Sequence, residues 1–273
     1  MTIDRDTIFT WLGHAGVEIK TPGGQVVLVD PWFGNPKSPR TVDQQQRCDV
    51  LLITHGHFDH FDRDTLELAK RTHPTMPCVH ELSLFLQHEI GESAEIIGMN
   101  AGGTVETHGL RITMVPAVHS SGDLFGGDAV KSFGEPAGFA IELENGYRVY
   151  HSGDTAVFGD MRLIRELYAP ELAMLSIGGH FTMDPRAAAV AVDFLGVRDV
   201  LPIHWGTFPL LAGTPGQLRE ALEAREVTAT VHAWEPGDTI SLGPRARVIW
   251  RPAEHDGLIG THLYALSAWV VAR

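Results

Sequence analysis

LLITHGHFDHFD, residues 51–62, is the stretch that decides which fold and which chemistry we expect. It opens as an apolar run, typical of a β-strand covered on both faces, and then places four metal-binding side chains within six residues: His55, His57, Asp59 and His60. Side chains two positions apart on extended backbone point the same way, so His55 and His57 can face one cation. After the chain turns, Asp59 and His60 can face a second. Without a cation this crowding would destabilise the chain through desolvation, which favours a metal site over a purely structural cluster.

Three more polar residues stand directly after short strand-like runs. His119 follows ITMVPAV, Asp154 follows YRVYHSG and His204 follows VLPI. Side chains at the ends of strands in a layered sheet can meet at one rim although they lie far apart in the sequence. We therefore expect these three to join the HGHFDH turn, although a single histidine at a strand end is more often an ordinary hydrogen-bonded residue than a ligand.

Short β-rich runs separated by Gly, Pro, Asn and Asp predict a β-meander in the first third of the chain. Strands are predicted at residues 7–12, 17–20, 25–29, 49–54, 78–80, 95–97, 109–115, 138–143, 147–151, 172–176 and 200–203. Helical spacing is found at residues 62–71, 161–168, 184–195 and 217–224, and β-like runs such as RVIW return beyond residue 228. No fixed-period repeat or long linker divides the chain, so we expect one domain over residues 1–273, with a segment of unassigned role at 244–273. The pattern predicts a layered α/β fold of two mostly antiparallel sheets with helices outside.

Composition indicates in which compartment the protein works and which partners it binds. The formal charge of −13 weighs against nucleic acid, because the counterion release that drives such binding needs clustered Lys and Arg. The first residues lack the basic start and apolar stretch of a signal peptide, and no apolar run reaches the roughly 18 residues of a membrane span. Cys48 and Cys78 permit a disulfide but do not require one. We expect a cytoplasmic protein with a small-molecule substrate and no membrane partner. The sequence is compatible with either a monomer or a homo-oligomer.

The run HGHFDH at 55–60 resembles the HxHxDH signature of the metallo-β-lactamase superfamily. SGDT at 152–155 resembles that superfamily's bridging-aspartate motif, and PIHWGTFP at 202–209 resembles its final histidine motif. WLGHA at 11–15 and IGGHFTM at 177–183 are most similar to the ascorbate-6-phosphate-lactonase-like branch. The resemblance implies a four-layer αβ/βα sandwich.

The same resemblance implies a pair of metal ions. His55, His57 and His119 would hold one ion, and Asp59, His60 and His204 would hold the other, with Asp154 as the bridge. Two divalent cations are expected, zinc first, with manganese or iron as alternatives for the same ligands. The bridging aspartate argues against a true β-lactamase, and His57 stands where the oxygen-reducing di-iron relatives have glutamate.

The expected activity is hydrolysis of an ester-like bond, in a lactone or a phosphoester. Two cations about 3.5 to 4 Å apart would share a water and lower its pKa toward about 7, with Asp59 or Asp154 as the catalytic residue that orients it. Five residues in motif-like segments are predicted to line the substrate pocket or to be ordinary structural residues: His14, His180, Phe181, Trp205 and Phe208. The glycine-rich residues 120–138 are predicted to form a loop over the site. The alternatives are a non-catalytic metal-binding or sensor protein and, with less support, a nuclease.

Overall fold

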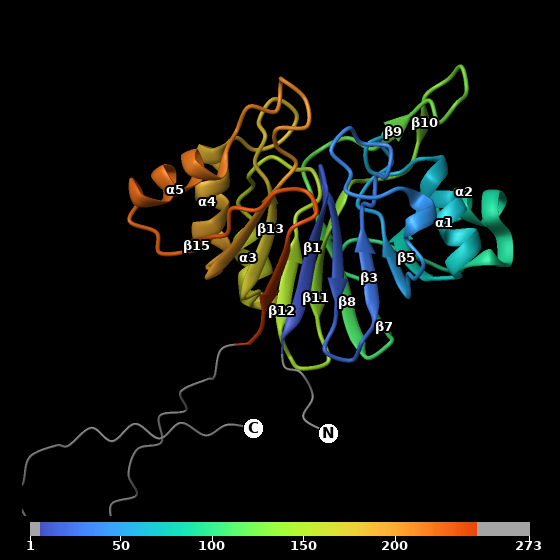
Figure 1. Ribbon diagram of the computed structural model, residues 1–273, viewed down its shortest axis with the longest axis horizontal. Coiled ribbons are helices and arrows are strands. Elements are labelled where there is room, and N and C mark those ends of the chain that lie inside the picture. The colour runs from blue at the N-terminus through green and yellow to red at the C-terminus, as the bar shows by residue number, and fades with distance from the viewer. Residues whose placement is uncertain (1–5, 245–273) are drawn as a thin grey trace, which may run out of the picture.

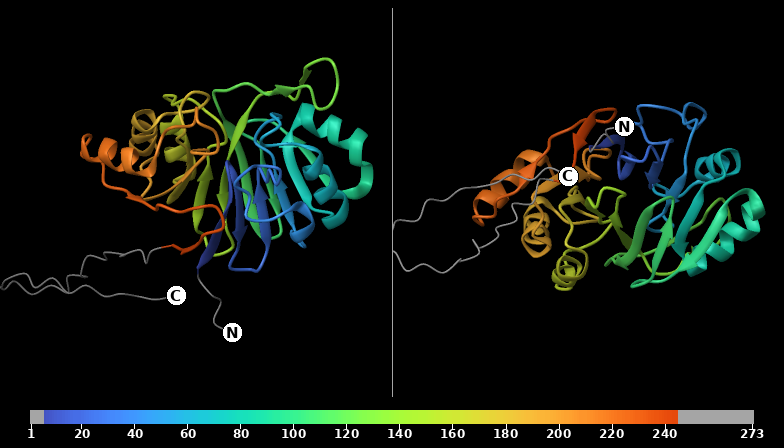
Figure 2. Two further views of the ribbon diagram at one scale, coloured as in Figure 1. Left: turned by 45° about the horizontal axis from the view of Figure 1, so that its top comes forward. Right: turned by 90° about the horizontal axis from the view of Figure 1, so that it is seen from below.

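Two seven-stranded β-sheets lie face to face, with helices on both outer sides (Figure 1, Figure 2). This computed structural model describes residues 6–244. The strand expected at RVIW and the role of residues 245–273 lie outside the described residues. The four layers confirm the predicted sandwich.

The first sheet begins with the predicted meander, in which the three strands within residues 7–29 are antiparallel neighbours. The next three pairings in this sheet, within residues 26–99, are parallel. In spatial order its strands are β16 (Thr239–Leu242), β1 (Thr7–Gly13), β2 (Gly16–Lys20), β3 (Val26–Val29), β4 (Val50–Leu52), β5 (Thr75–Val79) and β6 (Glu95–Met99).

The second sheet has the same division into a parallel and an antiparallel half. Its strands in spatial order are β15 (Thr230–Val231), β14 (Asp199–Ile203), β13 (Leu172–Ser176), β12 (Arg148–His151), β11 (Ala137–Glu142), β8 (Leu110–Pro116) and β7 (Thr104–Thr107). The pairings from β15 to β12 are parallel and those from β12 to β7 are antiparallel. Both sheets are thus evenly mixed where the sequence suggested mostly antiparallel pairing.

The helices form one group on each side of the sandwich (Figure 1). They are α1 (Arg63–Thr72), α2 (His80–Ile90), α3 (Met161–Tyr168), α4 (Pro185–Leu195) and α5 (Pro215–Glu223), with short 3₁₀ turns η1 (Val42–Gln44) and η2 (Gly91–Ser93). Helix α2 contacts β5 and β6, whereas α4 contacts β13 and α5 contacts β15. Among residues 6–244, no helix has the length and apolar character needed to cross a bilayer.

Local sequence signals explain where two of the helices begin. The side chain of Asp62 accepts a hydrogen bond from Thr65 N and caps α1. Asp184 caps α4 in the same way, and Pro185 occupies its first turn.

One helix was not predicted. The strand expected at residues 78–80 is the end of β5, which stops at Val79, but α2 starts at His80 where no helix was expected. Leu82, Leu86 and Ile90 are the apolar residues that α2 buries, and their spacing of four is that of a helix face.

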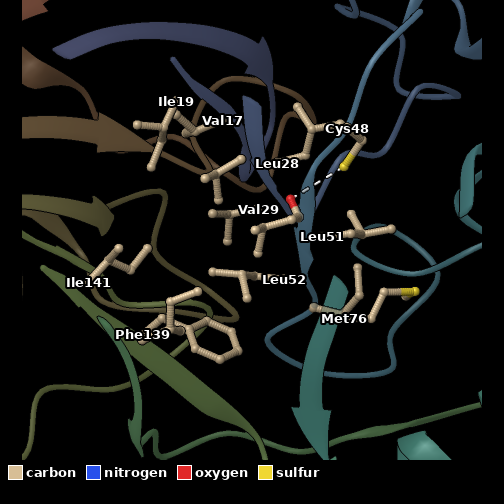
Figure 3. Close-up of a cluster of buried hydrophobic side chains, with 14 of the residues drawn as sticks. Val17, Ile19, Leu28, Val29, Cys48, Leu51, Leu52, Met76, Phe139 and Ile141 are labelled. Carbon is tan, nitrogen blue, oxygen red and sulfur yellow. Dashed lines mark hydrogen bonds between the residues drawn. The ribbon is translucent and has the colours of Figure 1, made fainter. Parts of the chain in front are cut away.

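The main core fills the space between the sheets. Phe139 and Ile141 of β11 lie beside Val29 and Leu52 of the first sheet, and all four are at most 1% exposed (Figure 3). Leu51 points to the opposite face of β4 from Leu52, because successive side chains of a strand alternate (Figure 3). A second core lies between the other sheet and helices α3 to α5. Burial of one such side chain stabilises the fold by about 1.5–3 kcal/mol.

Candidate metal centre

The predicted ligands, together with His14 and Asp30, which were not predicted as ligands, follow the carboxyl ends of strands that run in the same direction. In the first sheet His14 follows β1, Asp30 follows β3 and the HGHFDH turn follows β4, while in the second sheet His119 follows β8, Asp154 follows β12 and His204 follows β14. The two packed sheets therefore bring these side chains to one edge of the sandwich, the edge from which the short strands β9 (Gly122–Asp123) and β10 (Lys131–Ser132) project in Figure 1.

The HGHFDH turn is closed by its own backbone hydrogen bonds and packs against the Phe133 ring. The backbone N–H groups of His60 and Phe61 both donate to His57 O, at 3.0 and 2.8 Å. Gly56 faces the Phe133 ring so closely that a Cβ at this position would lie 2.2 Å from a ring carbon. The turn can therefore pass Phe133 only with glycine at position 56.

His55, His57 and His119 form the first candidate ligand set. One nitrogen from each ring lies within 4.8 Å of the others, and His55 Nε2 lies 2.9 Å from His57 Nδ1. Burial lowers the pKa of all three imidazoles below its ordinary value. They are therefore neutral near pH 7, which is the form that binds a metal.

Asp59, His60 and His204 form the second candidate set. One ligand atom from each lies within 4.8 Å of the others, and His14 shares this group. Asp59 Oδ2 lies 3.9 Å from His204 Nε2 and 2.9 Å from His14 Nε2. Burial raises the pKa of Asp59, but the hydrogen bond from His14 and the nearby His60 outweigh burial and hold that pKa well below its ordinary value.

Asp154 lies between the two sets. Its Oδ2 is 2.9 Å from His204 Nε2, 3.4 Å from His60 Nε2 and 3.7 Å from His119 Nε2. Its Oδ1 accepts a hydrogen bond from Ser176 Oγ at 3.2 Å. One carboxylate oxygen thus faces histidines of both sets, the position that a bridging ligand needs.

The chemistry of this donor set fits divalent cations. Within the described residues, His204 Nδ1 is buried without a hydrogen-bond partner, and His60 Nε2 and His204 Nε2 face Asp154 Oδ2 without the geometry of a hydrogen bond, a costly arrangement unless another group binds them. Burial raises the pKa of Asp154, but His204 and His60 outweigh it and hold that pKa far below its ordinary value. A buried carboxylate that stays ionised needs positive charge beside it, and imidazole with carboxylate is a ligand set suited to zinc.

Outer hydrogen bonds fix the ligands, and these were not predicted. Asp30 Oδ2 lies 2.8 Å from His60 Nδ1 and accepts from Thr54 Oγ1 at 2.6 Å, while Asp30 Oδ1 accepts from Thr54 N at 2.8 Å. A carboxylate behind a ligating imidazole sets its tautomer and orientation. The signal was present, because Asp30 follows the apolar run VVLV just as the predicted ligands follow theirs.

The five residues predicted to line the substrate pocket divide into three groups. His14 and Phe208 lie at the second ligand set, with ring centroids 5.8 Å apart. Trp205 stacks on the buried Trp11 at 5.4 Å and donates from Nε1 to a backbone carbonyl, so much of its ring belongs to the core. His180 and Phe181 are exposed neighbours, and their role as substrate contacts stays a prediction.

Comparison with known proteins identifies the family. A model of the β-lactamase superfamily domain matches residues 25–205. The protein belongs to this superfamily. It is 45% identical to a UPF0173 metal-dependent hydrolase of Koribacter versatilis over 234 residues. The aligned residues cover 85% of this chain and 97% of the relative. A UPF0173 metal-dependent hydrolase of Roseiflexus sp. is 44% identical over 244 residues, 88% of this chain and 99% of the relative.

A solved structure agrees with this assignment. Igni18, a metallo hydrolase of Ignicoccus hospitalis, has a TM-score of 0.77 and 33% sequence identity, with coverage of 88% of this chain and 100% of Igni18. This superfamily member is accordingly a metal-dependent hydrolase. Its place in the ascorbate-6-phosphate-lactonase-like branch stays a prediction.

Proposed function

We propose that this hydrolase holds two divalent cations and cleaves an ester-like bond, in a lactone or a phosphoester, of a small molecule. The observation that carries the proposal is the place of Asp154, whose Oδ2 lies within 3.7 Å of histidines from both ligand sets. Two separate groups of ligand atoms joined by one carboxylate are what a pair of cations needs.

The proposed ligands follow from this grouping. His55, His57 and His119 bind one cation, and Asp59, His60 and His204 bind the other. Asp154 bridges them. Zinc suits neutral imidazoles and carboxylates, and manganese or iron can use the same ligands.

The chain's own residues have distinct tasks in this reaction. When bound, a pair of divalent cations polarises a carbonyl or phosphoryl oxygen and makes a water nucleophilic at neutral pH. Of the two aspartate ligands, Asp59 has the more exposed side chain, at 16% against 3% for Asp154. Its low pKa keeps the carboxylate ionised, so it can accept a hydrogen bond from an incoming water. His14 holds Asp59 in place. Asp154, at 3% exposure, is enclosed and stays ionised beside His204 and His60.

Charge and thiol chemistry support the proposed partner and compartment. The net charge of −13 disfavours a polyanion such as RNA or DNA, whose binding would also fall steeply with salt. Cys48 and Cys78 are buried free thiols, in keeping with a reducing cytoplasm.

Metal analysis combined with a substrate screen tests the proposal. The purified protein should bind two equivalents of zinc and turn over members of a panel of lactones and phosphoesters. Asp154→Ala should lose metal and hydrolysis together, whereas Asp128→Ala, an exposed aspartate of the β9–β10 connection, should lose neither. Full hydrolysis with two bound cations in Asp154→Ala would contradict the bridging role. A fully metallated protein without turnover on the panel would contradict the proposed substrate classes.

A further inference from the structure

Exposed apolar side chains gather at the metal-binding edge. Of the nine large hydrophobic residues that are exposed within residues 6–244, three lie on helices α2 and α3. The other six lie on connections at the carboxyl ends of strands or between β9 (Gly122–Asp123) and β10 (Lys131–Ser132): Phe58, Val118, Leu124, Val130, Phe181 and Leu210. Such a concentration at one edge marks a surface that binds something apolar.

Phe58 is the member of this group closest to the chemistry. It stands in the chain between His57 and Asp59, one residue of each candidate ligand set, and 53% of it is exposed. Its backbone N–H donates to Asp123 Oδ2 at 3.1 Å, which fixes the turn without using the ring. The ring is therefore presented to solvent by a backbone that is already held in place.

Two further aromatic rings lie beside this surface, the buried Trp32, at 9% exposure, and the half-buried Phe208. Trp32 meets Phe58 edge to face at 5.6 Å and lies 6.0 Å from Phe208. Trp32 also lies 5.2 Å from His14, which contacts Asp59. The three rings of Trp32, Phe58 and Phe208, here called the aromatic wall, thus border the second ligand set.

A hollow continues the aromatic wall. It has a volume of about 470 Å³ and is formed by the segment that follows His204, with Phe208, Pro209 and Leu211 in its lining. Phe208 belongs to both the wall and the hollow. A wall of uncharged rings beside the proposed cation site offers stacking and apolar contact to part of a substrate.

We infer that the substrate carries an apolar chain or ring, which lies on the aromatic wall with Phe58 as the residue that selects it. This inference rests on the proposed function, since it places the scissile ester-like bond at the cations and the apolar group beside them. Phe58 gains contact with the apolar group both before and during reaction. Its effect should therefore appear in KM more than in kcat.

A chain-length series tests this selection. With fatty-acyl esters or lactones from two to eight carbons, kcat/KM of the zinc-loaded protein should rise about two- to fourfold per added methylene. Phe58→Ser should flatten this rise at unchanged zinc content, and Phe58→Leu should restore most of it. Leu163→Ser, which removes a similarly exposed side chain from α3, should leave the rise intact. Turnover that does not depend on chain length would overturn the inference while leaving the proposed function standing.

A binding measurement separates this inference from hydrolysis. Alkylphosphonates from methyl to octyl should bind the zinc-loaded protein with affinity that increases with chain length, and Phe58→Ser should remove the increase. This result would support the aromatic wall even if no ester were turned over. If Phe58→Ser instead lowers the mass in solution and leaves the phosphonate series unchanged, the exposed edge joins two copies of the chain and the inference is wrong.

Discussion

His14 Nε2 lies 2.9 Å from Asp59 Oδ2, and this contact is a hydrogen bond from a neutral imidazole. Burial lowers the pKa of His14 to about 4, so the ring carries one proton near pH 7. Because the Asp59 carboxylate is ionised and can only accept, that proton is on Nε2. His14 Nδ1 must then accept from Thr207 Oγ1, 3.0 Å away. A chain of two hydrogen bonds thus leads from Thr207 to a proposed metal ligand.

Replacing Thr207 tests this chain. Thr207→Val keeps the shape of the side chain but leaves His14 Nδ1 buried without a donor, so the free energy of unfolding should fall by about 1–3 kcal/mol. The freed imidazole should also orient Asp59 less well, and metal affinity should fall up to about tenfold. Thr207→Ser restores the hydroxyl and should recover both values. Equal metal affinities for the Val and Ser variants, from titration with a competing chelator, would contradict the role of the hydroxyl.

Asp30→Asn should weaken the metal centre without removing a ligand. Asp30 is wholly buried, and its two oxygens face three donors, from His60 and Thr54. An amide would turn one acceptor into a donor, and His60 would lose the carboxylate that orients it. We expect metal affinity to fall about 10- to 100-fold.

Asp49→Asn is the matched control for Asp30→Asn. Asp49 also accepts a hydrogen bond from a backbone amide, that of Val26, at 2.7 Å, but it directly precedes β4, at the other end of that strand from the HGHFDH turn. It should change stability and leave zinc affinity unaltered. A similar loss of zinc affinity in both variants would indicate a general loosening of the fold.

Part of this site could be predicted from the sequence. The placement of His119, Asp154 and His204 beside the HGHFDH turn could be predicted, because residues after parallel strands emerge at one edge. Their assignment to particular cations came from resemblance and stays a proposal.

The hydrogen-bond partners of the ligands could not be predicted in the same way, although Asp30 shares with the ligands a place directly after an apolar run. Asp30 and Thr207 act through atoms that only the folded chain brings within 3 Å, and neither belongs to the HGHFDH turn. The contact between Trp32 and Phe58 could not be predicted either. Both residues lie in connections, where no strand or helix periodicity indicates which side chains meet. Pairing in the sheets was predicted as mostly antiparallel because the opening meander is antiparallel, whereas crossovers through helices make the later pairs parallel.

Gly56→Ala should strain the metal-binding turn. The new methyl group would lie 2.2 Å from Phe133 Cδ2, and Phe133 is packed among Phe61 and Phe85 and cannot retreat freely. Overpacking of this kind destabilises by about 1–3 kcal/mol. Urea unfolding should report that loss together with weaker zinc binding.

The double variant Gly56→Ala/Phe133→Ala identifies the cause of that strain. Phe133→Ala alone should cost about 3–5 kcal/mol through the cavity it leaves. Since the two residues are in contact, the double variant should be more stable than the sum of the single losses predicts. Strict additivity would mean that the cost of Gly56→Ala comes from its own backbone and not from Phe133.

The two cysteines should be unreactive while the protein is folded. Cys48 and Cys78 are at most 2% exposed, and burial raises the pKa of both thiols, that of Cys78 to about 12. The thiolate is the form that reacts, so iodoacetamide at pH 8 should leave the native protein unmodified. Mass spectrometry should find two labels per chain in urea. Rapid labelling of either cysteine without denaturant would contradict the burial of that thiol.

Burial of the Cys78 thiol should also make stability depend on alkaline pH. Its folded pKa of about 12 lies above the roughly 8.5 of an unfolded chain, so the folded state binds this proton more tightly. The contribution is complete below about pH 8.5 and is lost as pH rises from there toward 12, by about 1.4 kcal/mol per pH unit. Cys78→Ala has no thiol to titrate, so its free energy of unfolding should fall less steeply between pH 8.5 and 10.5 than that of the parent protein. Parallel curves for the two proteins would mean that the Cys78 thiol titrates alike in the folded and unfolded chains.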